Sequence, residues 1–142
     1  NDWQKKLIAL GVKKSEIIFI NQSANTQEEA RNLIPLLKEK NIESSFVYSV
    51  PQHVVRAFLT DLGVAKELNY EGKIYPATLK GVDFEERITI KPLAGPTEKT
   101  TRLGRFAEEI IRIIEYQEKY HAGDKRFTIA SLQEGLKYLL NL

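Results

Sequence analysis

FVYSVPQHVVRA, residues 46–57, is the stretch that decides how the rest of the chain is interpreted. Its apolar start predicts a buried strand, and Pro51 then breaks the strand and favours the first turn of a helix. His53 and Arg56 are three residues apart, so they would share one side of that helix near its N-terminus. Backbone N–H groups at a helix N-terminus favour an anion. A strand that leads polar side chains to such a terminus is the usual ligand-binding geometry of an open α/β sheet.

Helix and strand patterns alternate around this stretch. We expect helices at residues 2–10, 27–40 and 52–62, and strands at 16–20 and 45–50. Thr26 and Glu29 form a predicted capping box for the second helix, and Gly63 is expected to end the third. The alternation predicts a parallel sheet with right-handed crossovers.

The second half of the chain has weaker patterns. We expect strands at 73–77 and 87–91, a loop at 92–102, and helices at 103–120 and 129–140. The apolar face of the last helix is predicted to consist of Leu132, Leu136, Leu139 and Leu140. The acidic residues of the preceding helix are expected mostly on a solvated face with Arg112 and Lys119, namely Glu108, Glu109, Glu115 and Glu118. The prediction is a single α/β domain over 1–142, with a sheet-forming core at 2–91 and a C-terminal helical extension at 92–142.

Composition excludes several kinds of protein. A chain of 142 residues can bury one hydrophobic core. The net charge of +2 is small and its cations are dispersed, so we expect no nucleic-acid partner. The absence of cysteine excludes disulfides, thiolate metal sites and a cysteine nucleophile. The chain has no His-x-x-x-His pair, so no metal site is expected from this chain alone. No run is apolar enough for a transmembrane helix, and no targeting segment is recognised.

Methionine is also absent, even at position 1. A translated chain normally begins with methionine, so we expect Asn1 to be a processing site, an expression boundary or the edge of a fragment. Any segment that attaches the protein to a membrane would then lie outside this sequence.

The polar residues at the two predicted strand–helix junctions have two interpretations. Thr26 alone can cap a helix, which leaves Asn25 open to either a capping or a binding role. His53 is either an exposed turn histidine or a base, acid or hydrogen-bond donor, because a helix N-terminus disfavours the imidazolium. Arg56 forms either a surface ion pair or a bidentate contact with a phosphate or carboxylate.

Taken together, the two junctions resemble a known family. Residues 23–28, Ser-Ala-Asn-Thr-Gln-Glu, follow one predicted strand, and Ser49 with His53-Val54-Val55-Arg56-Ala57 follows the next. This order is similar to that of the YdcF/SanA/ElyC-like family, bacterial envelope-associated proteins grouped as a domain of unknown function. The resemblance covers residues 2–80. Glu29 stands where the family usually has Asn, Ser49 replaces its Thr, and Val50 replaces its Ser.

The resemblance implies a fold and a site. It implies a Rossmann-like three-layer sandwich with a mostly parallel sheet, plus C-terminal helices. The chain would be the C-terminal part of that domain, because the family's glycine-rich loops of the first half are not in it. A missing N-terminal half or a partner subunit would complete the sheet. The resemblance assigns a catalytic role to His53 and ligand-binding roles to Ser23, Asn25, Thr26, Glu28, Ser49 and Arg56.

The function implied is binding of a small anionic ligand, phosphate-containing or nucleotide-like, at the carboxyl edge of the sheet. A hydrolase or transferase in cell-envelope metabolism would fit, with a cytoplasmic or envelope-associated location. S-adenosylmethionine is a cofactor implied by the resemblance only. The competing hypothesis is a non-catalytic ligand sensor or protein-interaction scaffold that kept the fold.

Overall fold

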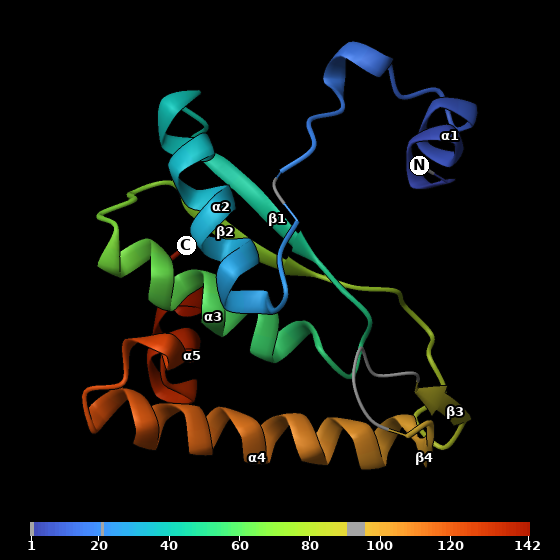
Figure 1. Ribbon diagram of the computed structural model, residues 1–142, viewed down its shortest axis with the longest axis vertical. Coiled ribbons are helices and arrows are strands. Elements are labelled where there is room, and N and C mark those ends of the chain that lie inside the picture. The colour runs from blue at the N-terminus through green and yellow to red at the C-terminus, as the bar shows by residue number, and fades with distance from the viewer. Residues whose placement is uncertain (1, 21, 91–95) are drawn as a thin grey trace.

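The computed structural model describes residues 2–20, 22–90 and 96–142, which form a mixed α/β protein (Figure 1). The helices of this described part are α1 (Asp2–Ala9), α2 (Thr26–Glu39), α3 (Val54–Glu67), α4 (Arg102–His121) and α5 (Leu132–Leu140), with short 3-10 turns at Lys14–Glu16 and Lys125–Phe127. Its strands are β1 (Ser44–Tyr48), β2 (Lys73–Ala77), β3 (Arg87–Ile90) and β4 (Glu98–Thr101).

Two small sheets are present in the described residues. β1 and β2 pair in parallel, with Ser44 opposite Lys73 and Tyr48 opposite Ala77. The predicted parallel sheet is therefore present in part, as one pair of strands joined by the helical crossover α3. β3 and β4 form a separate antiparallel pair. The observed architecture is therefore a small parallel sheet with helices, and the larger three-layer sandwich stays a prediction.

The hydrophobic core lies on one face of the parallel sheet. α3 is its centre and contributes Phe58, Leu59 and Leu62. The buried side chains around it come from α2, β2 and α4 and include Ala30, Ile34, Ile74 and Ile113. The other face of β1 is bare, because Phe46 is 72% exposed and Tyr48 is 65% exposed. Parallel sheets are normally covered on both faces. One layer of helices thus covers this sheet within the described chain.

The predicted strand at 16–20 is wrong. Glu16 closes a 3-10 turn, and residues 17–20 pair with no strand. Ile18 and Phe19 are each 55% exposed. Strand propensity alone does not make a strand, since the backbone needs a neighbour to bond. Figure 1 shows α1 and the segment after it standing apart from the other elements.

Gly63 was expected to end the third helix, and it does not. α3 runs on to Glu67, and Gly63 is buried within it. A Cβ at this position would lie 2.8 Å from backbone atoms of Ile129 and Ala130. The glycine therefore serves close packing of the chain after α4 against α3, not helix termination.

Two expectations for the second half also need correction. Residues 98–101, expected in a loop, form β4 because they pair with β3. Lys91 and the first part of the expected loop, residues 91–95, lie outside the described residues. In α5, Gly135 and Tyr138 face the core, whereas Leu136 is 61% exposed and Leu140 is 78% exposed.

None of the helices in the described ranges is long and apolar enough to cross a membrane.

Candidate functional site

Glu109 of α4 is the centre of a buried polar cluster. Its side chain is only 2% exposed. One carboxylate oxygen, Oε2, accepts from His53 Nδ1 at 3.0 Å and from the Arg56 guanidinium. The other oxygen, Oε1, is 3.0 Å from both Arg105 Nη2 and Arg112 Nη1. The cluster therefore joins the start of α3 to the middle of α4.

His53 and Arg56 decide the charge state of this carboxyl. Burial by itself would raise the pKa of Glu109, because a charged group loses its hydration. Hydrogen bonds and opposite charges from His53 and Arg56 outweigh that effect and lower the pKa to about 2. Glu109 is thus ionised throughout the neutral range. The burial of Glu109 contradicts the expectation that it lies on a solvated face with Glu108.

The Glu109 carboxylate also orients the imidazole of His53. Nδ1 of His53 lies 3.0 Å from Glu109 Oε2 and 3.3 Å from Arg56 Nη2. A carboxylate can only accept, so the shorter contact requires a proton on Nδ1. In the neutral imidazole Nε2 then presents a lone pair, and Thr26 Oγ1 lies 3.5 Å from it. The imidazole of His53 therefore links the Thr26 hydroxyl to the Glu109 carboxylate, an arrangement of the kind that activates a hydroxyl or a water molecule.

The N-terminus of α2 lies at the outer end of this arrangement. Asn25 is its N-cap, and the Asn25 side chain accepts from the Glu28 N–H at 2.9 Å. This corrects the predicted capping box, which placed the cap one residue later at Thr26. The N–H groups of Thr26 and Gln27 donate to no described residue. Both groups therefore point out of the helix and can bind an acceptor.

A cleft of about 270 Å³ opens beside these N–H groups. It is lined by Asn25, Thr26, Gln27, Arg56, Thr60, Tyr116, Arg126, Phe127 and Thr128. Tyr116 and Phe127 supply an aromatic wall, with ring centroids 5.0 Å apart. Arg126 at the mouth pairs with Asp124 at 2.8 Å. The cleft thus combines helix dipole, hydroxyl groups and aromatic surface.

The structure separates the predicted site residues into two groups. Thr26, His53 and Arg56 come together, and Asn25 lines the same cleft. Arg56 faces Glu109 rather than an open anion site, which narrows the role expected for it. Ser23, Glu28 and Ser49 do not line the cleft: the Ser23 hydroxyl accepts from Asn32, the Glu28 carboxylate accepts from the Ala24 N–H, and the Ser49 carbonyl accepts from the Thr78 hydroxyl.

Sequence reasoning missed the residues of α4 that complete the cluster. Glu109 is 56 positions from His53, and local spacing cannot reveal such a pairing. A weak signal existed, since Arg105 and Arg112 flank Glu109 at helical spacings of four and three residues. Two arginines that share a helix face with one carboxylate are compatible with either a surface ion-pair network or a buried charge cluster. Only the packing of α3 on α4 decides between them.

A second buried carboxyl lies on another side of α3. Asp61 is 6% exposed. Burial raises its pKa to about 7, and repulsion from Glu29 of α2 adds to the effect. Asp61 lies next in sequence to Thr60 of the cleft but is not one of the residues that line it.

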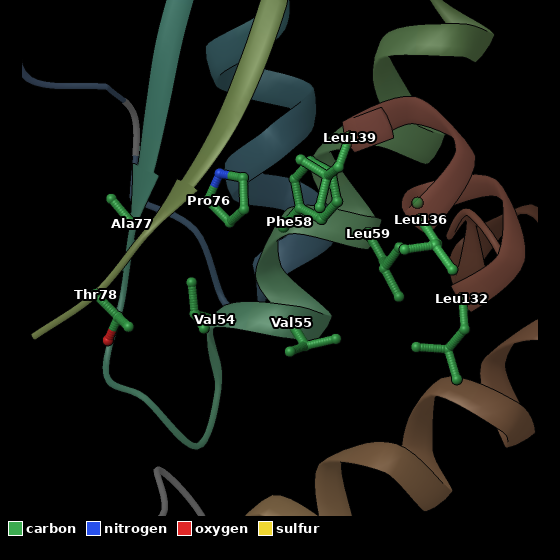
Figure 2. Close-up of a pocket in the computed structure, with 11 residues that line it drawn as sticks. Val54, Val55, Phe58, Leu59, Pro76, Ala77, Thr78, Leu132, Leu136 and Leu139 are labelled. Carbon is green, nitrogen blue, oxygen red and sulfur yellow. The ribbon is translucent and has the colours of Figure 1, made fainter. Parts of the chain in front are cut away.

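The molecule also has an apolar cavity of about 380 Å³ between α3, β2 and α5 (Figure 2). It is lined by Val54, Val55, Phe58, Leu59, Pro76, Ala77, Thr78, Leu132, Gly135, Leu136 and Leu139. No predicted site residue lines it. Val54 and Phe58 project from the side of α3 opposite to Arg56 and Thr60, so α3 separates this cavity from the polar cluster.

Within the described ranges, no three His, Cys, Asp or Glu side chains are grouped as metal ligands are. Comparisons with models of protein families, with curated proteins and with solved structures found no match to this chain.

Proposed function

We propose that this protein binds a small anionic ligand at the N-terminus of α2 and that His53 transfers a proton to or from it. The observation that carries the proposal is the line of side-chain contacts Thr26–His53–Glu109, which ends at the α2 N–H groups that bond to no described residue. A phosphate-containing or nucleotide-like ligand fits this chemistry, and the reaction class is hydrolysis or group transfer. The site lies beyond the carboxyl end of β1, where open α/β sheets bind ligands.

Charge at the site supports an anion. The cluster contains three guanidinium groups, Arg56, Arg105 and Arg112, against the carboxylates of Glu108 and Glu109. The excess positive charge lies behind His53, and the positive end of the α2 dipole lies in front of it. An anion in the cleft would be attracted from both directions. The aromatic pair Tyr116 and Phe127 could stack on a base or another planar group.

Each residue has a distinct role in this proposal. The Nε2 lone pair of His53 accepts a proton from the Thr26 hydroxyl or from a water that attacks the ligand. Glu109 holds the imidazole in the tautomer that permits this, and it stabilises the positive charge that then forms. Thr26 and Gln27 donate backbone N–H groups to the negative oxygens. Arg56 is a positioning residue, because it holds Glu109.

The proposal extends to the family and the complete fold. The chain would be a YdcF-like protein whose sheet continues into a Rossmann-like three-layer sandwich, with a role in the cell envelope. Support comes from the motif order in the sequence, the parallel β1–β2 pair and the bare face of β1.

A ligand panel on matched histidine variants tests the proposal. The panel contains inorganic phosphate, nucleotides, S-adenosylmethionine, sugar phosphates and isoprenoid phosphates. The variants are His53→Gln and, as the control, His121→Gln, which changes the chain's other histidine at the exposed end of α4. A ligand at a hundredfold excess over its Kd should stabilise the wild type by about 2.7 kcal/mol. We expect His53→Gln to abolish this stabilisation and His121→Gln to keep it.

Two results would overturn the binding proposal. One is a panel in which no member stabilises the wild type. The other is a ligand that stabilises His53→Gln as much as the wild type. Hydrolysis of p-nitrophenyl phosphate by the wild type and His121→Gln, but not by His53→Gln, would support catalysis. Ligand binding without turnover would favour the ligand-sensing alternative.

A further inference from the structure

The parallel sheet is closed at the β2 edge. The Ile74 N–H points away from β1 and donates to the Tyr138 hydroxyl of α5 at 2.8 Å. Pro76, the next outward-facing residue of β2, has no N–H. A proline and a side chain that covers the backbone are two ways in which proteins protect a sheet edge. No further strand can pair regularly with β2.

The β1 edge is open. Glu43 and Ser49 bond to β2 through their backbone groups, and the direction of these groups alternates along a parallel strand. The backbone groups of Ser44, Phe46 and Tyr48 therefore point away from β2. No described residue bonds to them. β1 contains neither a proline nor a charge, so nothing in its sequence opposes pairing with another strand.

An apolar segment of the same chain stands apart from this edge. We call residues 2–20 the arm. In α1, none of residues 2–9 is buried. Farther along the arm, Ile18 and Phe19 are each 55% exposed, and residues 16–20 (EIIFI) are rich in strand-forming side chains. The arm therefore has an unpaired strand-like segment, and β1 has an unpaired edge.

The loop after the arm is held in place. The Asn32 side chain donates to the Ser23 hydroxyl at 3.1 Å, and the Ala24 N–H donates to the Glu28 carboxylate at 2.8 Å. These bonds tie Ser23 and Ala24 to α2, and the arm stands apart from the body of its own chain (Figure 1).

The surface area shows how much of the molecule a partner could cover. The chain exposes 10016 Å² of solvent-accessible surface. A compact monomer of its mass, 16.3 kDa, exposes about 7,500 Å². The excess of roughly 2,500 Å² is in the range that each subunit of an obligate dimer buries. Scattered surface hydrophobics do not account for an excess of that size.

We propose that two copies of this chain exchange arms. Residues 16–20 of each copy add a strand to the open edge of β1 in the other, and the arm covers the bare aromatic face formed by Phe46, Tyr48 and Tyr75. Phe46 and Tyr75 already stack, with ring centroids 5.3 Å apart. The exchange is reciprocal, so it gives a closed two-fold dimer with two equal interfaces. This inference does not depend on the proposed ligand site.

Light scattering on two glutamate variants tests the dimer. Phe19→Glu places a charge in the arm, and Ile111→Glu places one on α4 at the same exposure, 55% against 56%. We expect wild type and Ile111→Glu to have twice the 16.3 kDa mass of one chain at 50 µM, and Phe19→Glu to have the mass of one chain. Both side chains are solvent-exposed, so circular dichroism should show both variants folded. A monomeric wild type, a dimeric Phe19→Glu or a monomeric Ile111→Glu would overturn the proposal.

Cysteine pairs test the exchange itself, because the chain has no cysteine of its own. Ile18→Cys and Phe46→Cys are introduced together in one chain and oxidised at low concentration. Arm exchange predicts covalent dimers, at least tenfold more than from the pair Ile18→Cys and Ile111→Cys. A covalently closed monomer would show that the arm folds onto its own β1 and would overturn the exchange. Equal yields from the two pairs would also overturn it.

Discussion

Replacing Glu109 with glutamine keeps the size of the side chain and removes the charge that holds the cluster together. In the folded protein the pKa of Glu109 is lowered from 4.5 to about 2. The unfolded chain therefore binds more protons than the folded chain between these values, and stability rises with pH in that window. Multiplying the pKa difference by 1.36 kcal/mol gives about 3 kcal/mol of stabilisation at neutral pH. Losing one partner of a buried ion pair costs a similar amount, about 3–5 kcal/mol.

Urea denaturation at two pH values measures this effect. We expect Glu109→Gln to lower the free energy of unfolding by about 3 kcal/mol at pH 7 and by roughly 1.5 kcal/mol at pH 3. The difference in unfolding free energy between wild type and Glu109→Gln is smaller at pH 3 because the Glu109 contribution is lost as the pH falls from 4.5 towards 2. Glu108→Gln is the matched control. Its side chain is 42% exposed and forms a single ion pair with Arg105, so a loss below about 1 kcal/mol is expected.

Either of two results would refute this reasoning. A Glu109→Gln loss no larger than that of Glu108→Gln would mean that the cluster contributes little to folding. A loss equal at pH 7 and pH 3 would mean that shape, and not charge, is responsible.

Three further predictions concern other positions. Asp61→Asn should stabilise the protein by up to about 4 kcal/mol at pH 8. The gain should shrink as pH falls from 7 to 4 in urea titrations, because a raised carboxyl pKa costs stability only above its unfolded value of 3.8. Gly63→Ala should lower the free energy of unfolding by roughly 2 kcal/mol, since its Cβ meets backbone at 2.8 Å. Gly135→Ala, whose Cβ would meet only side-chain carbons, should cost less in the same assay. Asn25→Ala should lower stability by about 1 kcal/mol and Thr26→Ala by less, because Asn25 is the observed cap; the reverse order in thermal melts would contradict this.

Local patterns predicted the elements that depend on local interactions. Strand β1 and helix α3 followed from the run of residues 46–57, because strand, proline and helix start lie side by side in sequence. The strand expected at 16–20 failed because strands depend on a neighbour that local sequence does not specify. The prediction that Gly63 ends the third helix was wrong for a related reason. Its lack of a side chain serves a contact with residues 129–130, which are far away in sequence.

The candidate site was predictable in part. His53 and Thr26 stood out because each follows a strand-like run and begins a helix. Glu109 did not, because its role depends on α4 packing against α3. Arg56 was recognised as a charge near His53, but its partner is an internal carboxylate. Sequence patterns can thus place polar groups at a strand–helix junction, whereas the packing of helices decides which of them remain open to a ligand.

The most direct test of the central claim is the ¹H–¹⁵N spectrum of the two imidazoles, recorded with and without inorganic phosphate. His121→Gln assigns the signals. We expect neutral His53 to carry its proton on Nδ1, with Nε2 unprotonated, and phosphate to shift the His53 signals while those of His121 stay in place. A proton on Nε2 of neutral His53, or His53 signals that do not respond to saturating phosphate, would contradict that claim.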